Sequence, residues 1–207
     1  MRGILMVAVA MLALTGCKQK ASDNHTVAVA PKADAPADRK VTASFDCDRA
    51  RGQAQELVCA DANLAAMDRE VARLGASDTA GQAAWAKARD DCGKADELQQ
   101  CVMANAVLRI HHLRSVTPGD AGGISVGPVG FACKGLTRPI AVTFINSDPG
   151  ALVVETNRQT VALDHVEAAS DARYAGRWNG EEWSFWEHGG EATLTVPGKP
   201  EMRCTRR

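Results

Sequence analysis

The chain has 207 residues, enough for one or two modest domains. Its formal net charge is −1, so it lacks the basic excess that nucleic-acid-binding domains need, and we expect no nucleic-acid partner. Aromatic residues make up only 4% of the chain, and three of the four tryptophans lie in the last thirty residues, which indicates that the two halves fold differently.

Residues 1–16 have the pattern of an export signal. Arg2 supplies a positive charge, and the apolar stretch 4–14 is too short for a permanent membrane-spanning helix. The letters LTGC follow and end at Cys17, which resembles the bacterial lipobox, whose cysteine is lipidated and becomes the new N-terminus. An ordinary secretory signal with a chance cysteine is the alternative. We expect a lipoprotein held at the membrane by the acyl chains on Cys17.

Residues 17–44 are predicted to form a flexible tether behind that anchor. The stretch is rich in Ala, Lys, Asp and Pro and has no apolar period. Lys18 stands where an aspartate commonly retains bacterial lipoproteins at the inner membrane. We therefore expect a cell-envelope protein at the outer membrane, facing the periplasm, if the source has an outer membrane.

The number of cysteines agrees with export. Lipidation of Cys17 would leave six, and six cysteines in an oxidising compartment favour three disulfides. A metal site is the alternative, but the sequence contains no CxxC or HxxxH pair, so we expect no metal and no cofactor. The six are Cys47, Cys59, Cys92, Cys101, Cys133 and Cys204.

Residues 45–114 are predicted to form a small helical domain. Asp61 is a good N-cap, apolar residues then recur at helical spacing, and Gly75 ends the run. Two further helices are expected over about 79–92 and about 97–114. Four cysteines would replace hydrophobic stabilisation that a bundle this small lacks, and their three possible pairings stay open. The apolar positions of the first helix are Leu64, Met67, Val71 and Leu74.

The period of the pattern changes after a Gly- and Pro-rich stretch, 115–130, which is predicted to be a linker. Residues 131–207 alternate apolar and polar side chains, with turn signals at 148–150 and at Asn179-Gly180. Short antiparallel strands at this spacing favour a small barrel or sandwich. Cys133 and Cys204 stand at the two ends of the segment, so we expect them to be joined. The fold class is therefore α+β.

Two stretches of this segment resemble the membrane-bound inhibitors of c-type lysozyme. Residues 169–174, ASDARY, are similar to the family's Ser-Gly-x-x-Tyr motif, and residues 185–194, FWEHGGEATL, are similar to its Phe-Trp-x-Lys-Gly-x-Glu-Ala-Thr run. The resemblance implies an eight-stranded antiparallel barrel that inserts two loops into the lysozyme cleft. The lysozyme-binding residues that it implies are Ser170, Arg173, Tyr174, His188 and Gly189. Two positions depart from the family: Asp171 replaces its glycine, and His188 replaces its lysine.

Residues 44–113 resemble the N-terminal domain of LprI-type lysozyme inhibitors. The resemblance rests on the SFDC stretch that ends at Cys47, on Cys59-Ala60-Asp61, on the RDDC stretch that ends at Cys92, and on Cys101. The role of this domain, whether spacer or second binding surface, stays open.

Three functions compete. The leading hypothesis is a binding protein that inhibits c-type lysozyme. The second is a structural or adaptor envelope lipoprotein that kept the barrel and lost inhibition, which Asp171 and His188 would favour. The third is an envelope enzyme such as a peptidoglycan hydrolase. We do not expect an enzyme, because no nucleophile elbow or zinc motif occurs, and His111-His112 has no obvious partner in the sequence.

Overall fold

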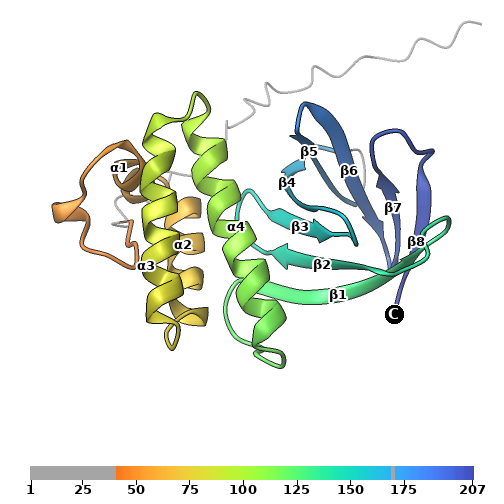
Figure 1. Cartoon of the computed structure of the whole chain (residues 1–207), viewed down its shortest axis with the longest axis horizontal. Helices are drawn as coiled ribbons and strands as arrows, with labels where there is room; N and C mark the ends of the chain where they lie inside the picture. The colour runs from red at the N-terminus through yellow and green to blue at the C-terminus, as the bar shows by residue number, and fades with distance from the viewer. Residues whose placement is uncertain (1–40, 169–170) are drawn as a thin grey trace, which may run out of the picture. The chain divides into compact units, whose positions relative to one another are not determined.

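The computed structural model describes residues 41–168 and 171–207, which fold into four α-helices followed by eight β-strands (Figure 1). Cys17 lies outside the described residues. The helices are α1 (Gln53–Ala60), α2 (Ala62–Leu74), α3 (Thr79–Asp91) and α4 (Leu98–Val116). The strands are β1 (Ser125–Cys133), β2 (Ile140–Ile145), β3 (Ala151–Glu155), β4 (Thr160–Val166), β5 (Ala172–Trp178), β6 (Glu181–His188), β7 (Glu191–Thr195) and β8 (Met202–Arg206).

The predicted caps and apolar stripe organise α2. The Asp61 carboxylate accepts hydrogen bonds from the backbone N–H groups of Asn63 and Leu64, at 2.8 and 3.0 Å, which satisfies donors that a helix start leaves unpaired. Gly75 follows the last helical residue. The four apolar positions expected to face the core, Leu64, Met67, Val71 and Leu74, are all buried. The sequence pattern did not separate α1, whose N-cap, Gly52, provides no side-chain cap.

Two disulfides join cysteines that are close in sequence. Cys47 pairs with Cys59, and Cys92 pairs with Cys101, so one of the three possible pairings is now assigned. The first bond ties the segment before α1 to the end of that helix. The second ties the end of α3 to the first turns of α4. Each bond therefore fixes a connection within the bundle.

The eight strands form a closed antiparallel barrel in which each strand pairs with the next and β1 pairs with β8. The third disulfide, Cys133–Cys204, joins residues that face each other directly across the β1–β8 seam, as expected. Large apolar side chains fill the interior. Those with no exposed surface are Phe131, Val142, Leu152, Val154, Val161, Leu163, Phe185 and Leu194.

Two predicted boundaries are wrong. The linker was expected to reach residue 130, but β1 begins at Ser125, because a register shift between Val126 and Val129 lets a strand continue past Pro128. The tether was expected to reach residue 44, but Ala43 is buried against the helices, and the Ser44 N–H donates to the Asp68 carboxylate at 2.6 Å.

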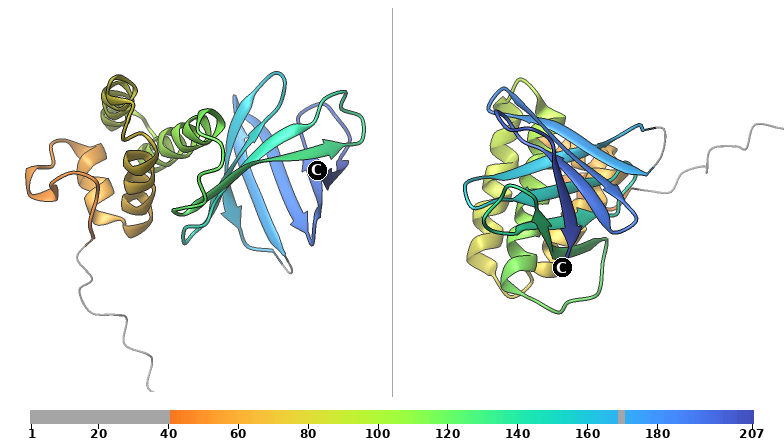
Figure 2. Two further views of the ribbon diagram at one scale, coloured as in Figure 1. Left: turned by 90° about the horizontal axis from the view of Figure 1, so that it is seen from below. Right: turned by 90° about the vertical axis from the view of Figure 1, so that its right-hand side faces the viewer.

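Helix α4 packs along the outside of the barrel, against β1 to β4 (Figures 1 and 2). The outward side chains of β2, β3 and β4 there join the hydrophobic core of the helices. These are Ile145, Ala151, Val153 and Ala162, none more than 4% exposed. The helices and the barrel wall therefore share one hydrophobic core, and the part of the barrel's outer face under α4 is buried from solvent.

Polar side chains complete this contact. The His111 ring lies between the Thr143 hydroxyl, at 2.8 Å from Nδ1, and the Glu155 carboxylate, at 3.0 Å from Nε2. His111 is buried, whereas its neighbour His112 is exposed. Within residues 41–168 and 171–207, no group of three metal-ligating side chains comes together.

A second polar cluster surrounds Glu70. Its carboxylate accepts two hydrogen bonds from Arg73, both at 2.9 Å, and one from Arg114 at 3.3 Å. The Ser125 hydroxyl at the start of β1 also donates to it. Burial alone would raise the pKa of Glu70, but these hydrogen bonds and the charges of the two arginines lower it below its usual value. The cluster links α2, α4 and β1.

No helix in the described part of the chain has the length and apolarity needed to cross a bilayer.

Candidate functional site

Two connections that the sequence analysis selected lie at the same end of the barrel. Antiparallel strands alternate in direction, so the connection between β4 and β5 and the turn between β6 and β7 emerge on one side. Ser170 lies outside the described residues. The remaining candidate residues are on β5, at the end of β6 and in the turn after β6.

The two positions that depart from the family motifs contact each other. The Nδ1 atom of His188 lies 3.0 Å from Oδ2 of Asp171. The His188 and Asp171 side chains are about one third and one half exposed, at 35% and 46%. Because an ionised carboxylate can only accept a hydrogen bond, Nδ1 carries the proton in this contact. This leaves Nε2 to face outward, and it makes no hydrogen bond within the described residues.

The His188 ring packs against the indole of Trp186. Its centroid lies 4.3 Å from that of Trp186, the preceding outward residue of β6. The Arg173 guanidinium lies 6.0 Å from the same indole, directly across from it in the β5–β6 pairing. Among the described residues Arg173 forms no ion pair. The outer face here is a short ladder of cationic and aromatic side chains.

Tyr174 points the other way, into the barrel. It is 8% exposed and makes edge-on contacts with the rings of Phe144 and His165, at centroid distances of 6.3 and 5.5 Å. Burial and, to a smaller extent, the negative charge of Glu187 raise the pKa of Tyr174 above its usual value. Tyr174 therefore supports the start of β5 from inside and presents little surface to a partner.

The backbone at both connections has left-handed residues. Gly189 and Gly190 have φ values of 53° and 99°, which glycine adopts without strain, and both are exposed. Asp171 has φ of 59°, so it adopts the backbone conformation that a glycine at this position would take. Replacement of the family's glycine has therefore kept a left-handed residue while it adds a carboxylate within reach of His188.

This contact is the feature that the sequence reasoning missed. Asp171 and His188 were treated as two separate departures, both unfavourable. A signal was available, because an acid and a base had replaced family residues in two motifs that the resemblance already placed at one binding surface. An acidic and a basic side chain at one surface commonly form a direct, charge-assisted hydrogen bond.

Comparisons with known proteins agree with both resemblances. Residues 131–203 match the family model described as membrane-bound lysozyme-inhibitor of c-type lysozyme. The chain is also similar to lipoprotein LprI of Mycobacterium bovis and to lipoprotein LprI of Mycobacterium tuberculosis. Each is 29% identical over 166 residues, which cover 75% of this chain and 80% of the relative. No solved structure matches the chain significantly. The resemblance of the C-terminal segment to the lysozyme inhibitors is thereby confirmed, and the closed eight-stranded barrel agrees with it.

Proposed function

We propose that this chain is a lipid-anchored envelope protein that inhibits c-type lysozyme by inserting the β4–β5 connection and the β6–β7 turn into the enzyme's cleft. The observation that carries the proposal is the juxtaposition of these two connections at one barrel end, bridged by Asp171 and His188, within the segment that matches the inhibitor family. The family is one of inhibitors, so we propose a binding protein and not an enzyme.

The chemistry of the site suits the lysozyme cleft. Lysozyme works with one protonated and one ionised carboxyl group. The hydroxyl of Ser170 could donate to the carboxylate and accept from the carboxylic acid. His188, when protonated, presents an Nε2–H donor and a positive charge to the ionised carboxylate.

Asp171 has two opposite effects in this arrangement. Its contact with Nδ1 holds the His188 ring in one orientation, at the position where the family's lysine supplies a positive charge. Its own negative charge repels the lysozyme carboxylates. The close contact with His188, at 3.0 Å, leads us to propose that the first effect dominates while His188 is protonated.

A turbidity assay tests inhibition directly. Purified chain added to lysozyme and a suspension of bacterial cell walls should slow clearing in proportion to the amount of chain added. Full clearing at a large molar excess of chain would favour a structural or adaptor lipoprotein, for which the carboxylate of Asp171 in the binding surface is the supporting observation. Clearing by the chain without lysozyme would instead identify an enzyme.

The lipid anchor is proposed from the motif at Cys17 and from the similarity to proteins named lipoproteins. Wild-type cells should incorporate a radioactive fatty acid into the chain, whereas Cys17→Ala should abolish the labelling. Equal labelling of the two proteins would contradict the anchor. Fractionation of the labelled cells would test the proposed outer-membrane location.

A further inference from the structure

The opposite end of the barrel holds a pocket. It is formed by the connections after β1, β3 and β7 together with the start of β6, all of which emerge on the side away from Asp171 and His188. Its volume is about 490 Å³. Pockets for small ligands commonly fall in a range of about 300–1,000 Å³, so this one has room for a molecule of one or two rings.

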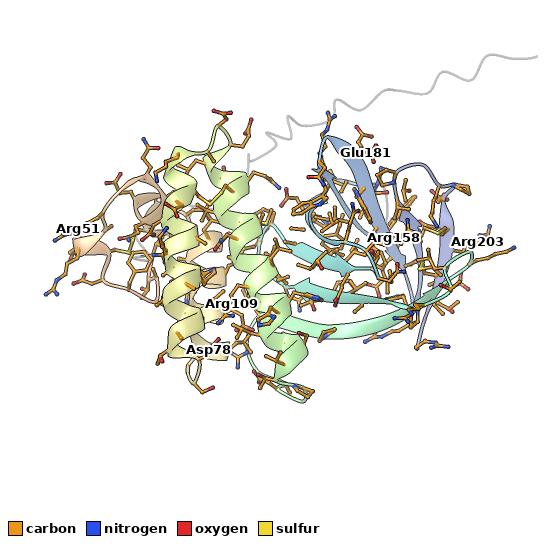
Figure 3. All side chains as sticks on the ribbon, in the orientation of Figure 1. Arg51, Asp78, Arg109, Arg158, Glu181 and Arg203 are labelled. Carbon is orange, nitrogen blue, oxygen red and sulfur yellow. A yellow bond between two sulfur atoms is a disulfide. The ribbon has the colours of Figure 1, made fainter. Side chains whose placement is uncertain are left out.

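Three cationic side chains line this pocket. Arg138 comes from the β1–β2 connection, Arg158 from the β3–β4 connection, and Lys199 from the β7–β8 connection. All three are exposed, and none forms an ion pair within residues 41–168 and 171–207. Glu181 is the single carboxylate of the lining. Figure 3 labels Arg158, beyond the end of β3, and Glu181, at the start of β6. Cations brought together from three separate connections favour an anionic ligand.

The rest of the lining is suited to a ring that carries hydroxyl groups. Trp183, 5% exposed, contributes from the barrel core, and Leu136, Val196 and Pro197 add apolar surface. Hydrogen-bonding side chains complete the lining: Thr137, Thr156, Asn157 and Gln159. An apolar wall with a few amide and hydroxyl groups can hold the less polar face of a sugar and its hydroxyl groups at the same time.

We propose that this pocket binds an anionic sugar, with the negative group placed between Arg138, Arg158 and Lys199. The negative group could be the carboxylate of an acidic sugar or a phosphate ester on a sugar. Guanidinium groups recognise both, because their paired N–H donors match the paired oxygens of either group. The proposal does not depend on lysozyme inhibition, since the pocket and the candidate inhibitory site are at opposite ends of the barrel.

Calorimetric titration of the purified chain with three related sugars tests this. N-acetylmuramic acid carries a carboxylate, N-acetylglucosamine 6-phosphate carries a phosphate, and N-acetylglucosamine has the same ring without either group. We expect one or both of the anionic sugars to bind at least about tenfold more tightly than the neutral one, the difference that a charge-assisted hydrogen bond provides. The stronger of the two anionic sugars identifies the source of the charge.

Charge-removing variants locate the site. The double variant Arg138→Gln with Arg158→Gln should weaken binding of the anionic sugar at least about tenfold and leave the neutral sugar unaffected. Arg203→Gln is the matched control, because Arg203 is an exposed arginine on β8 that does not line the pocket (Figure 3). All three substitutions are on exposed side chains, and far-ultraviolet circular dichroism would verify the fold.

Three outcomes would overturn the proposal: equal binding of charged and neutral sugars, equal losses in the double variant and in Arg203→Gln, or no binding of either anionic sugar at about 10 mM, a weak limit for a specific site. The double variant should inhibit lysozyme like the wild type. Failure of sugar binding would therefore leave the proposed inhibition untouched, and the reverse also holds.

Discussion

The contact between Asp171 and His188 predicts that the substitution Asp171→Asn has opposite effects on lysozyme inhibition in the presence and in the absence of His188. Asp171→Asn removes the negative charge and retains a residue that tolerates φ of 59°. With His188 present, the substitution removes the carboxylate that accepts a hydrogen bond from Nδ1 and holds the ring in place, so inhibition of lysozyme should weaken. In a His188→Ala background the contact with His188 is absent while the repulsion between Asp171 and the lysozyme carboxylates persists, so the same substitution should strengthen inhibition.

The structure sets the size of these effects. In the free chain both side chains are partly exposed, and such pairs contribute about 0.2–1 kcal/mol to stability, so the variants should fold normally. Inside a cleft that excludes water, a charge-assisted hydrogen bond from His188 is worth about 1–3 kcal/mol. His188→Ala should therefore raise the inhibition constant by roughly fivefold to 150-fold in mildly acidic solution.

The pH dependence has a definite sign. Histidine in general carries a positive charge in mildly acidic solution and loses it in mildly alkaline solution, so a contribution from a histidine's charge should be greatest at low pH. Lysozyme's own catalytic acid titrates at about pH 6, so the wild-type profile alone cannot be assigned. The comparison with His188→Lys isolates the histidine, because a lysine stays charged across this range and its profile should be flatter. Above neutral pH it should inhibit at least as strongly as wild type.

The assay is lysozyme turbidity clearing at several pH values. It compares the wild type, the three single variants Asp171→Asn, His188→Ala and His188→Lys, and the double variant that combines Asp171→Asn with His188→Ala. The reasoning fails if Asp171→Asn has the same effect with and without His188. It also fails if wild type, His188→Ala and His188→Lys inhibit equally from mildly acidic to mildly alkaline pH. In that case His188 lies outside the interface, and only the Ser170 side of the proposal survives.

Two further predictions concern stability. The pKa of Glu70 is lowered in the folded chain, so the ionised carboxylate stabilises the fold at pH values above the pKa of the unfolded chain. This stabilisation should be lost as the pH falls through the pKa of the folded chain. Acid should therefore destabilise the wild type more than Glu70→Gln. At neutral pH, Glu70→Gln should lower the free energy of unfolding in urea by about 1–3 kcal/mol, because it removes the nearest carboxylate of the buried Arg114, whose other carboxylate partner, Asp120, is 3.9 Å away. An unchanged midpoint would contradict the role of this cluster. Residues 131–207 produced alone should bind a hydrophobic dye and melt below the full chain, because they lack the first six residues of β1 and expose the wall that α4 covers. A melting temperature equal to that of the full chain would show that the barrel is independent.

The period of the apolar pattern was sufficient to predict most elements. The spacing of Leu64, Met67, Val71 and Leu74 identified α2 and its buried face, and the alternation from Ile140 onward identified the barrel strands. These predictions succeeded because each element buries one side, and a single buried side leaves a clear period in the sequence. Local signals also located Asp61, Gly75 and the turn at Asn179-Gly180 correctly.

The packing of α4 on the barrel was not predicted, because it covers strands whose other face is already buried. Residues 151–154 of β3 are all buried, since the barrel core takes one face and α4 the other. Alternation is lost in such a strand, and the unbroken apolar run ALVV was the available signal that something covers its outer face. The predicted start of β1 was wrong for another reason. Gly127 and Pro128 are typical of loops, but here they lie at an irregularity inside a strand.

The way α4 covers the barrel also suggests what the helical part does for the candidate site. It packs against β1 to β4, whereas Arg173, Trp186 and His188 lie on β5 and β6. The helices therefore support a different part of the barrel wall from the part that carries the ladder. We propose that the helical part is a scaffold for the barrel, so a substitution at its contact with the wall, such as at His111, should reduce stability before it reduces inhibition.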